Sequence, residues 1–303
     1  MARVPLEDLS PFSRRGGFER LSLSMATVEI GLENPFSVLH ISDTHLTAAY
    51  DNEPPSKQEL SLKRTRCFGG RQEEALRDSL LWARQHVDLI VHTGDIIDWQ
   101  SRANFDLVGK YASLCPGGTM IGCVGNHEYS PDMWLGSPKE TPTETYKDIS
   151  REALQAAMPF DIGFQATIHG GVNFIALDNV YGTVTAEQVD RFMSEREKGL
   201  PIVLCAHVPI YTERMWQMAR RYWNWRQPKF HDATPPPVEG ALRAQREDNV
   251  TSGFIRHLCG EPLLKAILCG HEHVAMQDRF SPTAMEFAVA GNYMFAGEEI
   301  LFV

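Results

Sequence analysis

Residues 36–45, FSVLHISDTH, lead a short apolar run directly into a cluster of polar side chains. A nearly continuous apolar run of this length is typical of a β-strand that is buried on both faces. The same succession returns along the chain, and each further run stops at Asp, Asn or His: 89–91, 120–124, 172–177, 202–206 and 266–269. Because ligands gather at the carboxyl ends of strands in such sheets, these clusters predict a site at one edge of a sheet.

Helical patterns separate the apolar runs. From Gln72 to Val87 the apolar side chains recur every three to four residues, which indicates a helix with one buried face. A second helix is predicted from Thr185, because Gln188 completes a capping box and Gly199 is placed to end the helix. The alternation of strands and helices predicts an α/β fold, and we interpret residues 1–303 as a single domain.

Two long segments, 46–71 and 211–251, interrupt this alternation. Each segment directly follows a polar cluster and is therefore placed to overhang a site. Loops of this length in compact domains are commonly functional lids or disordered, and the tryptophans of the second segment favour order. We expect a lid insertion at about 211–251, with a separate small domain there as the alternative.

The overall composition favours some classes of partner over others. The chain has 39 acidic and 29 basic residues and a formal charge of -10, so its field disfavours nucleic acid as a partner. No stretch approaches the about 18–20 apolar residues of a membrane span, and Glu7, Asp8 and Glu19 interrupt the N-terminal region where a signal peptide needs an apolar run. Six scattered cysteines suit a reducing compartment. We expect a cytoplasmic protein without a membrane partner, of undetermined oligomeric state.

The polar clusters supply a mixed set of oxygen and nitrogen donors without a thiolate at ligand spacing. Such a set suits Mn, Fe or Zn ions better than calcium or a structural zinc. The donors number seven, more than one tetrahedral ion needs: Asp43, His45, Asp95, Asn126, His207, His271 and His273. A carboxylate shared by two ions resolves the excess, so the sequence predicts a site for two divalent or trivalent metal ions.

The clusters resemble, in order and in type, the five motifs of the calcineurin-like metallophosphoesterase family: Asp43-Thr44-His45, Gly94-Asp95-Ile96-Ile97-Asp98, Gly125-Asn126-His127-Glu128, His207 and Gly270-His271-Glu272-His273. That resemblance implies a four-layer sandwich of two mixed β-sheets flanked by helices, with closing strands in the tail 286–303. Trp99 stands where the Ser/Thr protein phosphatases have an Arg-Gly pair, and the tyrosine of purple acid phosphatases is missing. His207-Val208-Pro209 is similar to the bacterial phosphodiesterase-like and predicted phosphohydrolase branches.

The resemblance also implies a role for each motif residue. Asp43, His45, Asp95 and His273 would hold one metal ion. Asp95, Asn126, His207 and His271 would hold the other, so that Asp95 bridges the two. His127 would donate a proton to the leaving oxygen, with Asp98 orienting its ring, and the nucleophile would be a metal-bound hydroxide.

Residues of the expected lid are candidates for binding the substrate. Arg220 and Arg221 could contact a phosphate, although surface charge is the alternative. Trp223 could stack on an aromatic group, although local packing is the alternative, and His231 lies in the same segment. Beside the ligands, Glu128 and Glu272 are interpreted either as partners of the ligands or as solvated carboxylates. Asp178-Asn179 ends an apolar run and is interpreted as a turn, with a contact to the site as the alternative.

These features predict a metal-dependent hydrolase of a small phosphomonoester or phosphodiester. One alternative is a nuclease of the same fold, which the acidic balance and the absence of a Lys/Arg stripe disfavour. The other alternative is a non-catalytic interaction protein that retains the fold. His127 beside Asn126, together with the complete set of ligand types, counts against a loss of catalysis.

Overall fold

The computed structural model describes residues 20–130, 143–226 and 248–303. Within these ranges eleven strands form two sheets, each mixing parallel and antiparallel neighbours. The first sheet has the order β1-β11-β2-β3-β4, with β1 Ser22–Val28, β2 Phe36–Ile41, β3 Leu89–Thr93, β4 Met120–Cys123 and β11 Ala296–Phe302. The second has the order β5-β6-β7-β8-β10-β9, with β5 Phe164–His169, β6 Val172–Leu177, β7 Ile202–Cys205, β8 Leu264–Cys269, β9 Met276–Arg279 and β10 Met285–Ala288.

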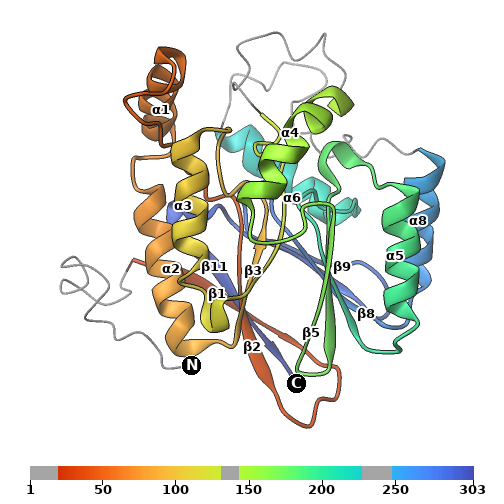
Figure 1. Cartoon of the computed structure of the whole chain (residues 1–303). Helices are drawn as coiled ribbons and strands as arrows, with labels where there is room; N and C mark the ends of the chain where they lie inside the picture. The colour runs from red at the N-terminus through yellow and green to blue at the C-terminus, as the bar shows by residue number, and fades with distance from the viewer. Residues whose placement is uncertain (1–19, 131–142, 227–247) are drawn as a thin grey trace.

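Helices cover the outer faces of both sheets. The helices are α1 Pro55–Cys67, α2 Gln72–His86, α3 Arg102–Ala112, α4 Thr143–Ala157, α5 Ala186–Arg196, α6 Glu213–Arg226 and α8 Asn249–Gly260, with 3-10 turns at Pro116–Gly118, Val180–Gly182 and Asn292–Met294. In Figure 1, α2 and α3 lie on one side of the paired sheets, and α5 and α8 lie on the other. This arrangement confirms the predicted four-layer sandwich.

The continuous apolar runs arise because successive residues of a strand serve different cores. Val38 and Phe174 belong to the core between the two sheets. Their neighbours point the other way: Leu39 packs in the core that includes α2, and Ile175 packs in the core that includes α5 and α8. Since both faces of the central strands are covered, nearly every position in them has to be apolar.

The predicted elements are present, with their ends shifted by a few residues. The run 89–91 is part of β3, and 266–269 is part of β8. Thr185 caps α5 in a complete capping box with Gln188, although the helix ends at Arg196 and Gly199 follows with φ 69°. The closing strands also form, but they belong to different sheets, since β10 pairs with β8 and β11 lies between β1 and β2. The partly exposed strands β1, β5 and β9 were not predicted.

The two interrupting segments contain helices. Treating 46–71 as a loop was wrong, because it contains α1, a helix with no buried residue and therefore no apolar pattern to predict it. The segment 211–251 begins with α6, whose Met215 and Ala219 pack in a cluster with Met276 of β9. Residues 227–247 lie outside the described ranges, so the extent of the lid stays a prediction. No helix in the described ranges combines the length and the apolarity that crossing a membrane requires.

Candidate metal centre

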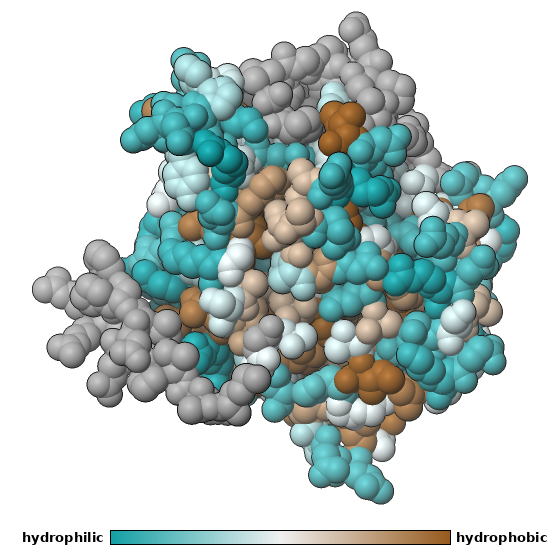
Figure 2. Space-filling view, viewed as in Figure 1, coloured by the Kyte–Doolittle hydropathy of each residue, from teal (hydrophilic) through white to brown (hydrophobic). Residues whose placement is uncertain are grey.

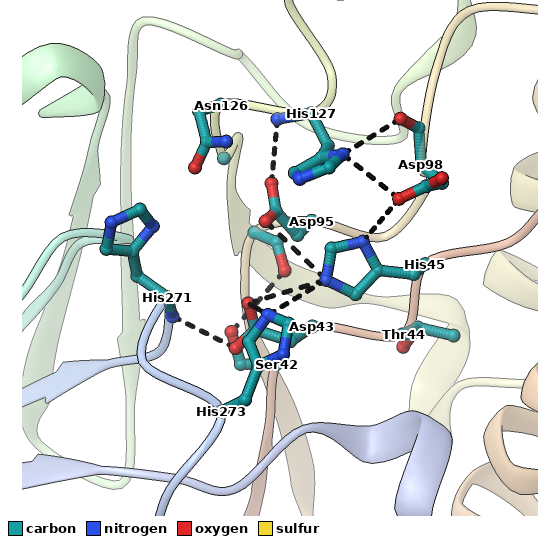
Figure 3. A network of polar contacts seen from close by, with 12 residues as sticks. Ser42, Asp43, Thr44, His45, Asp95, Asp98, Asn126, His127, His271 and His273 are labelled. Carbon is teal, nitrogen blue, oxygen red and sulfur yellow. Dashed lines mark hydrogen bonds and ion pairs between the residues drawn. The ribbon is translucent and has the colours of Figure 1, made fainter. Parts of the chain in front are cut away.

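The seven predicted ligands come from loops that follow strands of both sheets. Asp43 and His45 follow β2, Asp95 follows β3 and Asn126 follows β4, all in the first sheet. The second sheet contributes His207 after β7 and both His271 and His273 after β8. Figure 3 shows the side chains of Asp43, His45, Asp95 and His273 pointing toward one another, with Asn126 and His271 beside them. The site therefore lies where the strand ends of the two sheets meet.

One group of donors is formed by Asp43, His45, Asp95 and His273, whose ligand atoms all lie within 4.8 Å of one another. His45 Nε2 is 3.0 Å from His273 Nε2 and 3.7 Å from Asp95 Oδ2. His45 Nδ1 lies 2.9 Å from Asp98 Oδ1 and so carries the ring proton when the ring is neutral, which leaves the Nε2 lone pair facing the group. Asp43 Oδ1 is buried without a hydrogen bond in the described structure. A cation would satisfy all of these atoms.

A second group forms around His207, on the other side of Asp95. His207 Nε2 lies 3.4 Å from Asp95 Oδ2, 3.2 Å from Asn126 Oδ1 and 3.2 Å from His271 Nδ1. Asp95 Oδ2 is therefore within 4 Å of a histidine nitrogen of each group. This is the position that a bridging carboxylate would occupy.

The electrostatics of the cluster favour a positive charge at its centre. Burial alone would raise the pKa of Asp43 and Asp95, but the surrounding histidines hold both below the usual range. Burial alone would lower the pKa of His207, yet Asp95 and Asp43 raise it to about 10. The pKa of His271 falls to about 3 through burial and the neighbouring His207, so its ring is neutral. Ligation of a metal would replace the His207 proton, as metal binding to histidine generally does.

Backbone strain is concentrated at the predicted ligands. Five of them have a left-handed backbone, with φ between 52° and 68°: Asp43, His45, Asp95, His271 and His273. Such a conformation costs an L-residue about 1 kcal/mol or more and clusters at functional sites. Gly94 has φ 94°, and a Cβ there would lie 2.6 Å from His207 Nδ1 and 2.7 Å from the Gly125 nitrogen. Only glycine allows these loops to approach so closely.

Both glutamates beside the ligands are buried partners rather than solvated carboxylates. Glu128 accepts hydrogen bonds from the backbone nitrogens of Asp95 and Gly125 at 2.9 and 2.6 Å and of Ile97 at 3.0 Å. Glu128 thereby connects the motif Gly125–Glu128 to the motif Gly94–Asp98. Glu272 accepts a hydrogen bond from Trp223 Nε1 at 2.7 Å, which connects the fifth motif to α6.

His127 and Asp98 lie in direct contact, and the roles that the resemblance implies for them stay predictions. His127 Nδ1 lies 2.9 Å from the Asp98 carbonyl oxygen and 3.0 Å from Asp98 Oδ1, and the His127 backbone nitrogen donates to Asp95 Oδ1 at 2.9 Å. The ring is thus held through its Nδ1 atom. Burial would lower the pKa of His127, but Asp95 and Asp98 raise it to about 9.

The family model described as calcineurin-like phosphoesterase matches residues 36–275. The chain belongs to this family. Among solved structures, a dimetal phosphatase from Danio rerio is 13% identical with a TM-score of 0.49, over 86% of this chain and 89% of that one. A candidate 5′-nucleotidase from Staphylococcus aureus is 14% identical with a TM-score of 0.46, over 86% of this chain and 49% of that one. No curated protein matches.

Several residues of this phosphoesterase that support the site were missed from the sequence or assigned mainly to another role. Asn179, interpreted as part of a turn, accepts hydrogen bonds from the backbone nitrogens of His207 and Val208 at 3.0 and 2.9 Å and donates to the Val208 oxygen at 2.6 Å. Its place just after the apolar run 172–177 was the only signal for this role. Tyr293 Oη lies 3.3 Å from His273 Nδ1, and nothing in the sequence pointed to it. Arg64 contacts Asp98 and was also missed.

The predicted substrate-binding residues do not converge on one point as the predicted ligands do. The Trp223 ring centre is 6.2 Å from that of His273, but its Nε1 already donates to Glu272. Arg220 and Arg221 are exposed on α6, and Arg220 lies over the Trp216 ring at 5.5 Å. No contact joins either arginine to the seven donors in the described part of the chain. His231 lies outside the described residues. A role of these residues in substrate binding remains a prediction.

Proposed function

We propose that this phosphoesterase is a dinuclear metal-dependent hydrolase of a small phosphomonoester or phosphodiester. The observation that carries the proposal is the convergence of seven donors from both sheets around Asp95. The buried Asp95 carboxylate has a histidine nitrogen of each group within 4 Å, and it accepts a hydrogen bond from the His127 backbone nitrogen. A purely structural metal site is closed by its ligands. This combination of residues suits a catalytic site for phosphoryl transfer to water better than such a structural site.

The donor chemistry fits two ions of the Mn, Fe or Zn type, because carboxylate, amide and imidazole groups are present without a thiolate. Asp43, His45, Asp95 and His273 would hold one ion. Asp95, Asn126, His207 and His271 would hold the other. When bound, two such ions would polarise the phosphoryl group and provide a water nucleophile of lowered pKa.

His127 would assist the departure of the leaving group. Because Nδ1 is held by Asp98, a proton on Nε2 can pass to the leaving oxygen. The raised pKa of His127 keeps the ring protonated at neutral pH before metal binds. Asp98 fixes both the tautomer and the direction of the ring, as a carboxylate partner of a catalytic histidine generally does.

The two alternatives have less support. A net charge of -10 opposes the approach of a nucleic acid, so a nuclease is disfavoured. A non-catalytic interaction protein would not need the contact that orients the His127 ring through Asp98.

Hydrolysis of chromogenic esters tests the proposal. The purified protein would be loaded with Mn(II), Fe(II) or Zn(II) and assayed with p-nitrophenyl phosphate and bis-p-nitrophenyl phosphate, beside an Asp95→Ala control. Metal-dependent turnover that is lost in the control supports the proposal, and the preferred ester separates monoesterase from diesterase. Absence of turnover with every metal would favour the non-catalytic alternative. Parallel assays with cyclic nucleotides and single-stranded DNA would narrow the substrate class and test the nuclease.

A further inference from the structure

Asp98 has a third partner besides His45 and His127. Arg64 of α1 approaches its carboxylate with two nitrogens: Nε lies 2.6 Å from Oδ2, and Nη2 lies 2.9 Å from Oδ1. The Asp98 side chain is completely buried, whereas that of Arg64 is 23% exposed. A guanidinium fork of this kind fixes the plane of a carboxylate, since rotating the plane breaks at least one of the two bonds.

The orientation of the Asp98 carboxylate matters because one of its oxygens serves two histidines. Oδ1 lies 2.9 Å from His45 Nδ1 and 3.0 Å from His127 Nδ1. His45 belongs to the predicted metal ligands, and His127 is the proposed proton donor. A rotated carboxylate could not keep both contacts, so the plane set by Arg64 decides whether the two rings are held together.

The helix that carries Arg64 is attached to the rest of the molecule largely by polar contacts. None of the residues of α1 is buried, and Figure 2 shows its part of the surface, in the position that α1 has in Figure 1, as predominantly hydrophilic. Lys57 Nζ donates to the Gln100 carbonyl oxygen at 2.6 Å, and Thr65 Oγ1 lies 2.6 Å from Thr47 Oγ1. A hydrophobic core therefore does not explain why α1 is docked over the site.

A second contact of the same segment points to the site as well. Phe68, directly after α1, stacks on the His45 ring with centroids 4.4 Å apart and an interplanar angle of 12°. The Arg64 guanidinium in turn lies 4.9 Å from the centre of the Phe68 ring. Arg64 and Phe68 thus hold His45 from two sides, one through Asp98 and one by direct stacking.

We propose that Arg64 is a positioning residue of the reaction, which fixes the Asp98 carboxylate so that Oδ1 orients His127 and His45 together. The inference rests on the proposed function for its consequence in catalysis. Arg64 does not itself meet the reacting atoms in this role. Its effect reaches the substrate through Asp98 and His127.

Leaving-group dependence distinguishes this role from simple anchoring of α1. Arg64→Met should lower kcat for phenyl phosphate, whose leaving group needs a proton, by about 10- to 100-fold, as loss of an outer-shell partner commonly does. The same variant should hydrolyse p-nitrophenyl phosphate at close to the wild-type rate, because nitrophenolate departs without protonation. Arg64→Lys retains the charge without the fork and should restore little.

Lys57→Met provides a matched control. It removes another polar anchor of α1 and leaves Asp98 untouched. This variant should keep the wild-type ratio of the two rates. If Arg64→Met and Lys57→Met reduce both rates equally, or if Arg64→Lys is fully active, the positioning role is overturned. In an Asp98→Asn background, Arg64→Met should add almost nothing, and a full additive loss would equally contradict the inference.

A measurement that does not need turnover separates this inference from the proposed function. Nitrogen-proton NMR of the histidine rings should show hydrogen-bonded Nδ1 protons for His45 and His127 in the wild type and in Lys57→Met. The His127 signal should broaden or vanish in Arg64→Met. A wild type that cleaves neither the monoesters nor bis-p-nitrophenyl phosphate with any of the metals would refute the proposed function, while an unchanged His127 signal in Arg64→Met would refute the positioning role.

Discussion

Asn179 offers a quantitative test of how the His207 loop is held. Its side chain accepts hydrogen bonds from the backbone nitrogens of His207 and Val208 and donates one to the Val208 oxygen. Both of these residues are buried, with 0% and 2% exposure, so water cannot replace the lost acceptor without rearrangement. Asn179→Ala leaves two buried N–H groups unpaired at about 1–3 kcal/mol each, a total loss of about 2–6 kcal/mol in unfolding free energy.

Asn173 is a matched control on the strand that precedes Asn179. It is also buried, but its side chain donates one hydrogen bond to Glu195, whose side chain is 19% exposed and can be rehydrated. Asn173→Ala should therefore cost only about 1 kcal/mol for that hydrogen bond. Urea unfolding of the metal-free proteins gives both free energies, and a metal titration gives the affinity. Equal losses in the two variants, or an unchanged metal affinity in Asn179→Ala, would refute the reasoning.

The remaining predictions concern the proton donor, a close loop contact and a buried acid. His127→Ala should retain its metals and lose about 10²- to 10⁴-fold in the hydrolysis of phenyl phosphate, and unchanged kinetics would remove His127 from the reaction. Gly94→Ala places a methyl group 2.6 Å from His207 Nδ1 and should destabilise the protein by about 1–3 kcal/mol, so an unchanged urea midpoint would contradict the close approach. Burial raises the pKa of Glu298 to about 7 from 4.5, so the folded state binds the proton more tightly and wild-type stability should fall as pH rises between these values. Glu298→Gln should lose this slope, and the stability difference between variant and wild type should change by about 3 kcal/mol from pH 4.5 to 7; parallel pH curves would contradict the assignment.

The strands that position the site could be predicted because they are buried on both faces. Runs such as 36–41 and 172–177 are mostly apolar, are buried at every position and end at polar residues, a pattern that needs no knowledge of the partner strands. Strands β1 and β5 gave no such pattern, because most of their residues are exposed or only half-buried. The division into two sheets depends on pairings between distant segments, such as β11 with β1 and β2, and only the family resemblance implied it.

The predicted ligands share one local signal that the supporting residues lack. Asp43, Asp95 and His207 each follow an apolar strand, so their position could be read from the sequence. Arg64 lies on a helix without a buried face, and its link to Asp98 spans 34 positions. A single polar contact between distant residues produces no periodic pattern in the sequence, so only the folded structure shows that Arg64 belongs to the site.

Metal stoichiometry tests the central claim of a shared aspartate most directly. The wild-type protein and Asp95→Ala would be loaded with Mn(II), freed of excess metal and measured by inductively coupled plasma mass spectrometry. Because Asp95 Oδ2 lies between His45 Nε2 and His207 Nε2, we expect two ions per chain in the wild type and none in the variant. A wild type that binds one ion or none, or a variant that still binds two, would contradict the account.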